Sequence, residues 1–290
     1  MDRLTIKQHK LNRIIKYYAM TSLILTLMLP TLITGVIYVQ RRDAILSEMA
    51  QVTRTLGAAI VERENEANRL AQILTATNAW EAELIRYFDL TYSQHWTYYL
   101  VNKAQPPFLP KEIHRQYRYN PYLQAIQIVL DGRDQVYESL VDNPYGRKVE
   151  VMTGLEGIHI VESLRSLSSF STIGQLIMTY NFDDLAGNLK NEMEGSLVYY
   201  DGPFSRLVGD LSILSPSQEP MVSQDRLGNY VRDWQRKYFV SEEVTRSGHR
   251  VYYLYPKIAL GKAMLPLFFL VFFVFLLVAG LVFSQVHNPV

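Results

Sequence analysis

The sequence predicts an α+β protein in which two transmembrane helices flank an extracellular folded region that begins with a long helix. Residues 17–39 and 263–283 carry no charged side chain, and each is long enough as a helix to cross a hydrocarbon core of about 30 Å. The segment between them starts with helical periodicity and continues with short runs typical of strands, which meet at Gly-containing turns. Together these features predict one exported region held between two membrane segments.

The composition excludes several classes of site. The chain has 290 residues, a net charge of +1 and no cysteine. Balanced charge disfavours a nucleic-acid partner, and the absence of cysteine excludes disulfides and cysteine-ligated metals. The six histidines stand at no metal-pair spacing, and no hydrolase elbow, phosphate-binding loop or zinc-protease pattern occurs. We therefore expect no cofactor, no metal ion and no catalytic residue in this chain.

The charges before the first apolar segment predict the orientation in the membrane. Five basic residues precede it against one acid, Asp2, and such an arm stays in the cytoplasm. These residues are Arg3, Lys7, Lys10, Arg13 and Lys16. Two crossings then return the C-terminus to the cytoplasm and leave residues 40–262 outside. No Asn-x-Ser/Thr sequon occurs, which together with the missing cysteines favours a bacterial cell membrane.

Residues 43–78 are expected to form a long amphipathic helix that continues from the first crossing. Apolar residues recur at steps of three, four and seven, which marks one helical stripe. The stripe comprises Ile45, Met49, Val52, Leu56, Ile60, Ala67, Leu70 and Leu74. Five charged residues lie largely off it: Glu62, Arg63, Glu64, Glu66 and Arg69. Such a helix is either a packing stalk or a rod that couples an outer domain to the membrane.

The rest of the outer region alternates strands and helices. Residues 126–130 alternate in the manner of a strand, and Asp131-Gly132 predicts a hairpin turn before a second strand, "QVYESL". "STIGQLIMTYNFDDLAGNLK" predicts another strand and a following helix capped by Asp183. "VYYDGPFSRLV" repeats the strand–turn–strand pattern, and a last hairpin is expected to turn at Ser247-Gly248. Two mixed α/β modules therefore follow the long helix.

This architecture resembles the extracellular double Cache (dCache) sensor region of Gram-positive membrane sensor histidine kinases. "LILTLMLPTLITGVIYVQRRDAIL" is similar to that family's first crossing, and "IGQLIMTYNFDDLAGNL" to the segment that closes its membrane-distal module. "SLVYYDGPFSRLV" resembles the opening hairpin of the membrane-proximal module, and "FSQVHNPV" the start of a HAMP linker. The resemblance covers nearly the whole chain.

The resemblance implies a division into tandem PAS-like modules. The expected parts are a cytoplasmic arm (1–16), a first transmembrane helix (17–39), an extracellular sensor (40–262) with its long helix (43–78), membrane-distal module (80–190) and membrane-proximal module (191–257), a second transmembrane helix (263–283) and the start of a cytoplasmic linker (284–290). In this family a kinase follows the linker, the receptor is a homodimer, and a cytoplasmic response regulator receives the signal. Pro289 would begin the linker.

The resemblance also implies a ligand site in the membrane-distal module, built from aromatic and a few polar side chains. The candidates are Trp96, Tyr99, Tyr117, Arg118, Tyr119, Tyr122, Tyr137 and Asp142. Each is alternatively a core residue. The Arg-x-Trp-Tyr element of the amino-acid-binding subfamily is absent, so the partner is either another extracellular small molecule or a solute-binding protein docked on the outside.

Two alternatives remain open from the sequence. The same sensor can serve a chemoreceptor or a membrane-bound transcription regulator, which differ only in the output domain. A chain complete at Val290 would instead be a two-pass membrane protein that scaffolds envelope machinery by contact. The first alternative keeps a ligand pocket in the outer region, and the second requires none.

Overall fold

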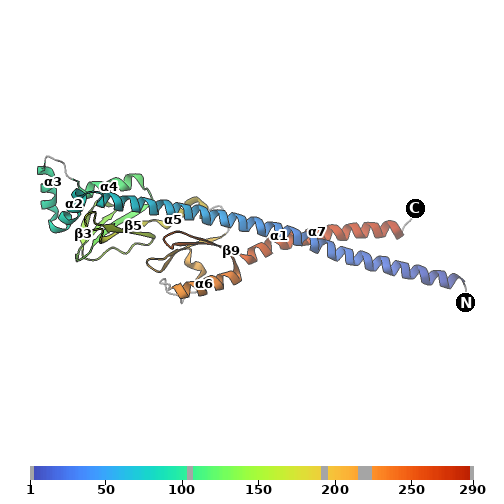
Figure 1. Ribbon diagram of the computed structural model, residues 1–290. Coiled ribbons are helices and arrows are strands. Elements are labelled where there is room, and N and C mark those ends of the chain that lie inside the picture. The colour runs from blue at the N-terminus through green and yellow to red at the C-terminus, as the bar shows by residue number, and fades with distance from the viewer. Residues whose placement is uncertain (1–2, 103–106, 191–194, 215–223, 288–290) are drawn as a thin grey trace. The chain divides into compact units, whose positions relative to one another are not determined.

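The computed structural model describes residues 3–102, 107–190, 195–214 and 224–287 (Figure 1). Met1, Asp2 and residues 288–290, which include the Pro289 of the expected linker, lie outside the described residues. The chain divides into two units, which are described separately. One comprises residues 1–48, 237–239 and 255–290, and the other comprises residues 49–236 and 240–254.

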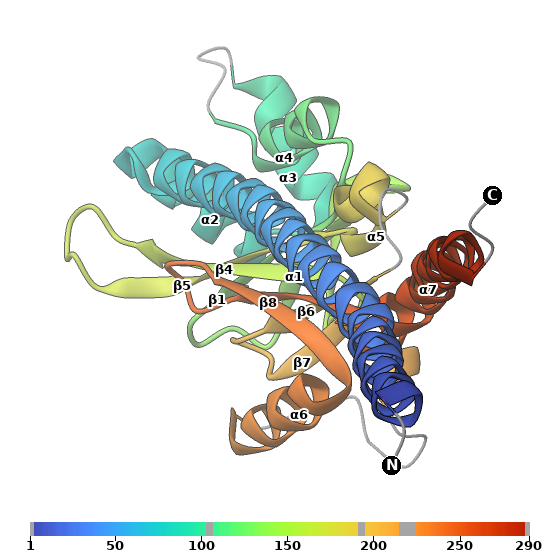
Figure 2. The same ribbon diagram turned by 90° about the vertical axis from the view of Figure 1, so that its right-hand side faces the viewer.

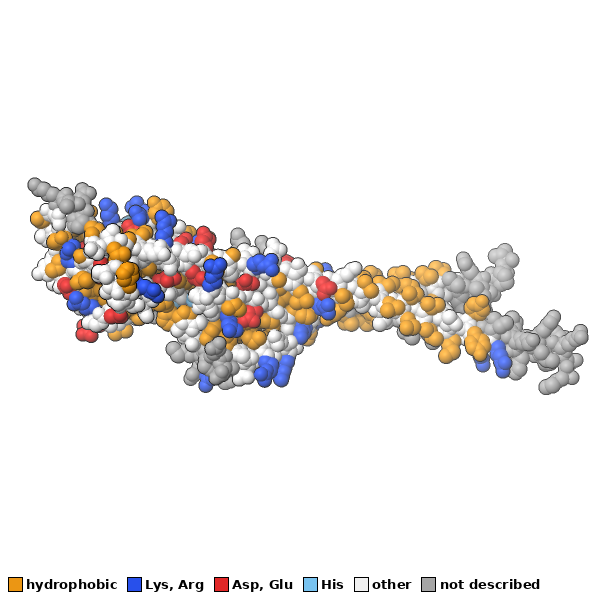
Figure 3. Space-filling model, in the orientation of Figure 1, with side chains coloured by type: hydrophobic (Ala, Val, Ile, Leu, Met, Phe, Trp, Pro, Cys, Tyr) orange, Lys and Arg blue, Asp and Glu red, His pale blue; other side chains and the backbone are white. Residues whose placement is uncertain are grey.

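The first unit contains most of the apolar sequence in two helices. Helix α1 (Arg3–Thr75) begins in this unit and α7 (Lys257–His287) ends it. Both helices are long and apolar enough to cross a membrane, and the most apolar stretch of each helix is almost entirely exposed. In Figure 3 hydrophobic side chains cover the described surface of these segments. Each helix holds one proline, Pro30 or Pro266, without a break.

In the second unit α1 lies against the folded core along one stripe. Five residues of the stripe have no more than 1% of their surface exposed: Met49, Leu56, Ile60, Leu70 and Leu74. This burial confirms the predicted stripe from Met49 onward. Arg63, which lies off that stripe, is nevertheless buried, with 8% of its surface exposed. Glu62 and Glu66 pair with its charge.

Three short helices follow α1 and gather around its C-terminal end (Figure 1). They are α2 (Asn78–Asp89), α3 (Tyr92–Val101) and α4 (Leu109–Tyr119). Thr77 caps α2 by accepting a hydrogen bond from the Trp80 amide. Thr91 and Gln94 form a reciprocal capping box at the start of α3, which satisfies two amide groups that a helix start leaves without partners.

A five-stranded antiparallel sheet comes next, in the order β3-β2-β1-β5-β4. Its strands are β1 (Leu123–Leu130), β2 (Val136–Leu140), β3 (Asn143–Val149), β4 (Ile158–Arg165) and β5 (Thr172–Tyr180). The predicted hairpin between β1 and β2 is confirmed, and Gly132 takes the positive φ of 75° that its turn requires. The register aligns Ile128 with Tyr137 and Leu176 on one buried face, and Gln127 with Glu138 on the other.

The second sheet has four strands in the order β7-β6-β9-β8. They are β6 (Ser196–Asp201), β7 (Arg206–Gly209), β8 (Tyr238–Val244) and β9 (Arg250–Pro256). Both predicted hairpins, β6–β7 and β8–β9, are confirmed. Helix α6 (Gln224–Lys237) lies beside this sheet (Figure 2), with the Trp234 ring 5.5 Å from the Tyr252 ring. The structure is therefore the mixed assembly of helices and sheets that the sequence predicts.

A short helix connects the two sheets. Helix α5 (Phe182–Ala186) leads into a 3-10 turn, Gly187–Lys190. A second 3-10 turn, Leu211–Ile213, follows β7. The predicted cap of α5 is wrong. Asn181 is the cap, because its side chain accepts hydrogen bonds from the amides of Asp183 and Asp184. Asp183 and Asp184 instead lie in the first turn of α5, where a negative charge interacts favourably with the helix dipole.

We expect two glycines to differ in what an added methyl group costs. Gly132 and Gly146 both have positive φ, 75° and 73°. A Cβ at Gly132 meets open space, whereas one at Gly146 would lie 2.4 Å from the Tyr137 ring. Gly132→Ala should therefore lower the free energy of unfolding by about 1 kcal/mol through backbone strain alone. Gly146→Ala should cost roughly 2–4 kcal/mol, because overpacking adds to that strain. Chemical denaturation of both variants measures these losses of unfolding free energy. Equal losses would contradict the close packing of Gly146 against Tyr137.

Candidate functional site

The candidate site is a cavity of about 560 Å³ in the second unit, which we call the α4 cavity. This volume lies within the range of small-molecule pockets. Its lining combines aromatic rings with charged side chains from α2, α3, α4 and β3. The lining residues are Trp80, Trp96, Tyr99, Phe108, Lys111, Glu112, His114, Arg115, Arg118 and Tyr145.

Aromatic rings form two walls of the α4 cavity. On one side the Tyr99 and Phe108 rings stack with centroids 4.2 Å apart, and the Trp96 ring meets Phe108 edge-on at 4.7 Å. On the other side His114 stacks on Tyr145 at 4.6 Å with an interplanar angle of 12°. Stacked and edge-on ring pairs of this kind hold each ring in one orientation. The walls are therefore preformed.

Basic side chains dominate the charge of the α4 cavity. Lys111, Arg115 and Arg118 face a single carboxylate, Glu112. One oxygen of that carboxylate, Oε1, accepts from Arg115 at 2.6 Å and from Gln116 at 3.1 Å. Lys111 and Arg118 make no ion pair with any residue that the structure describes. Two positive charges at the cavity therefore lack a counter-ion from the described chain.

Two buried ring nitrogens in the lining also lack partners. Neither Trp96 Nε1 nor His114 Nδ1 has a hydrogen-bond partner among the described residues, although both atoms are buried. Buried polar atoms are nearly always hydrogen-bonded, and an indole N–H can act only as a donor. Because both atoms are also shut off from solvent, their lack of a partner describes the packing of the lining rather than a contact open to a ligand.

A buried carboxylate behind the cavity holds its wall together. Glu83 of α2 is 1% exposed. Its Oε1 lies 2.8 Å from His95 Nε2 of α3 and accepts from the Leu109 amide, at the start of α4, at 3.0 Å. His95 in turn stacks on Phe108 at 4.9 Å. Glu83 and His95 thus join three helices behind the aromatic wall. Sequence reasoning missed both residues, since each sits in an ordinary helical stretch.

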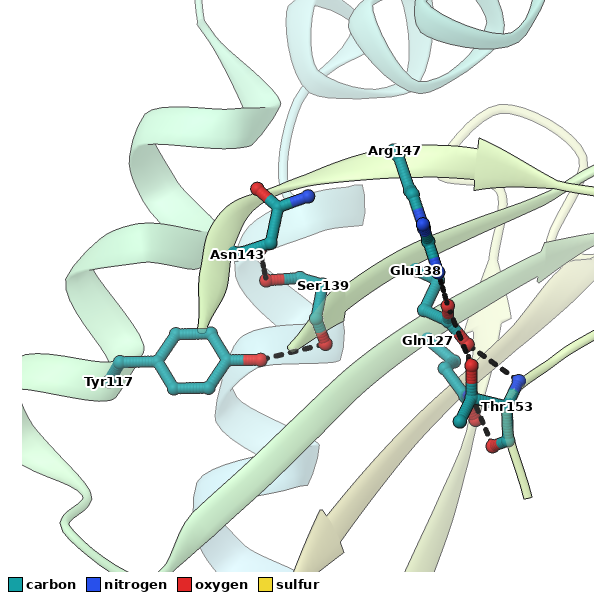
Figure 4. Close-up of polar contacts among 7 residues, drawn as sticks. All are labelled: Tyr117, Gln127, Glu138, Ser139, Asn143, Arg147 and Thr153. Carbon is teal, nitrogen blue, oxygen red and sulfur yellow. Dashed lines mark hydrogen bonds and ion pairs between the residues drawn. The ribbon is translucent and has the colours of Figure 1, made fainter. Parts of the chain in front are cut away.

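The structure brings three of the eight predicted ligand residues to this cavity: Trp96, Tyr99 and Arg118. The other five lie elsewhere. Tyr117 does not line the cavity, and its hydroxyl donates to the Ser139 carbonyl at 2.8 Å (Figure 4). Tyr137 is fully buried in the core. Tyr119, Tyr122 and Asp142 are exposed on the surface.

A second polar cluster lies on the sheet, around the buried Glu138 (Figure 4). Its carboxylate accepts from the Thr153 amide at 2.7 Å and from Gln127 Nε2 at 3.0 Å, and Arg147 approaches at 3.4 Å. Burial alone would raise the pKa of Glu138, but these hydrogen bonds outweigh it and hold the pKa below the ordinary value. The carboxylate stays ionised and its hydrogen bonds are filled, so the cluster fastens the loop after β3 to the sheet.

A third cluster joins the two sheets through a carboxylate with no solvent exposure, Asp201 of β6. Asp201 Oδ2 accepts from the His159 amide of β4 at 3.1 Å and lies 2.7 Å from the Nδ1 atom of the same histidine. The other oxygen, Oδ1, has no hydrogen-bond partner among the described residues and lies 3.9 Å from Nδ1 of His249, the residue directly before β9. One carboxylate thus contacts a strand of the first sheet and faces the β8–β9 turn of its own sheet.

The same cluster reaches α1 through His249. Its Nδ1 hydrogen-bonds with the Tyr199 hydroxyl at 2.7 Å, and its Nε2 lies 4.0 Å from Glu64 Oε1. Glu64 also accepts a hydrogen bond from Ser247, in the β8–β9 turn. We call His159, Asp201, His249, Tyr199 and Glu64 the junction cluster. It contains groups from β4, β6, the β8–β9 turn and α1.

Comparisons with known proteins give likenesses at the level of structure. No protein-family model matches the chain, and no curated protein sequence matches it either. The chain is similar to the sensory domain of the Campylobacter jejuni chemoreceptor Tlp3 with isoleucine bound (10% identity, TM-score 0.39, 77% of this chain and 97% of that chain). It is similar to the extracellular domain of soHK1S-Z6, described as a candidate histidine kinase (12% identity, TM-score 0.41, 78% of this chain and 99% of that chain). It is also similar to the periplasmic sensory domain of the C. jejuni chemoreceptor Tlp1 (10% identity, TM-score 0.31, 80% of this chain and 96% of that chain).

Acid is expected to destabilise the fold through His249. Burial lowers the pKa of His249 below its ordinary value of 6.5, and the nearby His159 acts in the same direction, against the opposite effects of Asp201 and Glu64. The unfolded chain therefore takes up this proton first, so the stabilisation is complete above about pH 6.5 and is lost as the pH falls toward the folded pKa.

Denaturant midpoints of the whole chain in detergent, measured between about pH 5 and pH 8, test this expectation. His249→Asn should reduce the loss of stability on the acid side. His114→Asn is the matched control and should keep the slope of the unaltered chain. An unchanged slope in His249→Asn would contradict the assignment.

Proposed function

We propose that this chain is the sensing and membrane part of a receptor that detects an extracellular ligand and transmits a conformational signal into the cell. The observation that carries this proposal is the way the two apolar helices meet the folded region. Helix α1 runs unbroken from Arg3 to Thr75, and α7 begins at Lys257, directly after β9 ends at Pro256. Neither helix is separated from the folded region by a loop.

A direct connection favours transmission over simple anchoring. A flexible linker would absorb a small movement, whereas a continuous helix passes it along its length. Gly57 supports close contact between α1 and β8, since a Cβ there would lie 2.7 Å from the Glu243 side chain. A ligand needs only a higher affinity for one of two arrangements to shift the balance between them. The α4 cavity offers a place for such a ligand, which a contact scaffold would not need.

The finer proposal follows from the sequence resemblance. We propose a dCache sensor of a Gram-positive two-component histidine kinase, with residues 80–190 and 191–257 as its membrane-distal and membrane-proximal modules. Residues 284–290 would start a HAMP linker, and the receptor would act as a homodimer that signals to a response regulator. A chemoreceptor or a membrane-bound regulator would use the same sensor with another output. Peptides that continue past Val290 in native membranes would identify the output.

Labelling with a thiol reagent that does not cross membranes tests the orientation on which this proposal depends. The natural chain has no cysteine, so each introduced one reports alone. Phe170 is 81% exposed at the β4–β5 turn, and Arg13 is exposed in the N-terminal arm. Phe170→Cys should be labelled in intact cells, and Arg13→Cys only after lysis, because the basic arm stays inside. Labelling of Phe170→Cys only after lysis would rule out an extracellular sensor.

A further inference from the structure

We propose that the α4 cavity binds a small organic acid that has a flat apolar body and no ammonium group. This inference rests on the proposed function and names the ligand class of that receptor. It depends on two features of the cavity: a helix face whose basic side chains outnumber the one carboxylate in the lining, and an aromatic wall.

The helix face that α4 turns to the cavity is basic and largely exposed, whereas Leu109, Pro110 and Ile113 form its buried face. Lys111, His114, Arg115 and Arg118 follow one another at positions i, i+3, i+4 and i+7, which places them on one side of a helix. Arg118 lies in the last turn of α4, where a positive charge interacts favourably with the helix dipole. Lys111 lies in the first turn, where a positive charge interacts unfavourably with the same dipole. A bound anion would offset the charge of Lys111 and interact favourably with the helix start.

The aromatic wall supplies a flat apolar surface. Tyr99 and Phe108 stack as a pair, and Trp96 stands edge-on to Phe108. A ligand with a ring can pack against this wall while its carboxylate meets the basic helix face.

The charge pattern also excludes an α-amino acid as the preferred ligand. Amino-acid sites pair the ammonium group with a carboxylate or other acceptors. The one carboxylate in the lining, Glu112, already pairs with Arg115 through Oε1, and three basic side chains surround it. An ammonium group would lie among cations that outnumber this carboxylate, and like charges repel. An acid without the ammonium group avoids this repulsion.

Three compounds of similar size separate these features: 3-phenylpropanoate, its neutral amide 3-phenylpropanamide, and L-phenylalanine, which adds an ammonium group. Binding to the full chain in lipid nanodiscs can be followed by tryptophan fluorescence, since Trp80 and Trp96 line the cavity. We expect 3-phenylpropanoate to bind at least about tenfold more tightly than either of the other two. Trp96→Phe should reduce the fluorescence response.

Charge-removing variants locate the effect. Arg118→Gln and Lys111→Gln should each weaken 3-phenylpropanoate and leave 3-phenylpropanamide unchanged, so the preference for the acid shrinks. Arg232→Gln, at an exposed position on α6, is the matched control and should change nothing. Using two variants guards against one that fails to fold, and thermal unfolding of each checks this.

The outcomes are distinct. Selective binding of 3-phenylpropanoate that is lost in Arg118→Gln supports the inference. Equal or tighter binding of L-phenylalanine or of the amide overturns the ligand class, as does the absence of binding by all three. None of these results depends on the orientation of the chain in the membrane, which cysteine labelling measures separately. The ligand class and the proposed receptor function therefore fail by different results.

Discussion

The contact between Asp201 and His159 is the constraint on which the arrangement of the two sheets depends. Asp201 has no solvent exposure, so its charge is acceptable only while its partners stay in place. Those partners are the main-chain amide and the ring nitrogen of a residue in the other sheet. One oxygen of the carboxylate has no hydrogen-bond partner among the described residues. A contact that is buried and incompletely satisfied is sensitive to small shifts of either sheet.

The junction cluster connects this contact to α1. His249 lies between Asp201 and Glu64, and Glu64 accepts from Ser247 in the β8–β9 turn. The preceding residue of α1, Arg63, pairs with Glu66 and hydrogen-bonds with Asn120, the C-cap of α4. The helix that carries the α4 cavity is thus fastened to α1 by a buried cation. Charged groups hold α1 to each sheet region at defined positions, which favours movement of α1 as a rod.

Local patterns predicted most of the elements, because they depend on residues close in sequence. The α1 stripe follows from a period near 3.6, and the three hairpins follow from alternation ended by Gly-containing turns. The cap of α5 was misassigned because Asn181 and Asp183 are both good caps, and their choice depends on where β5 ends. The burial of Arg63, which lies off the predicted stripe, could not be predicted because it comes from distant segments that close over α1.

The candidate site was only partly predictable for the same reason. Trp96, Tyr99 and Arg118 line the α4 cavity, whereas Tyr137 is in the core, and nothing in the residue types separates the two groups. Glu83 and His95 gain their role where three helices meet. The distance between His159 and Asp201 in the sequence hides their contact, since no local pattern connects residues 42 positions apart.

A double-mutant cycle between His159 and Asp201 tests most directly whether this contact couples the sheets. The unfolding free energies of His159→Ala, Asp201→Ala and the double variant give the interaction energy. The exposed pair Arg250 and Glu242, at 3.2 Å, provides a control cycle that should give less than about 1 kcal/mol. The buried contact predicts a coupling of about 1–3 kcal/mol. A value no larger than that of the control would contradict the central role of Asp201.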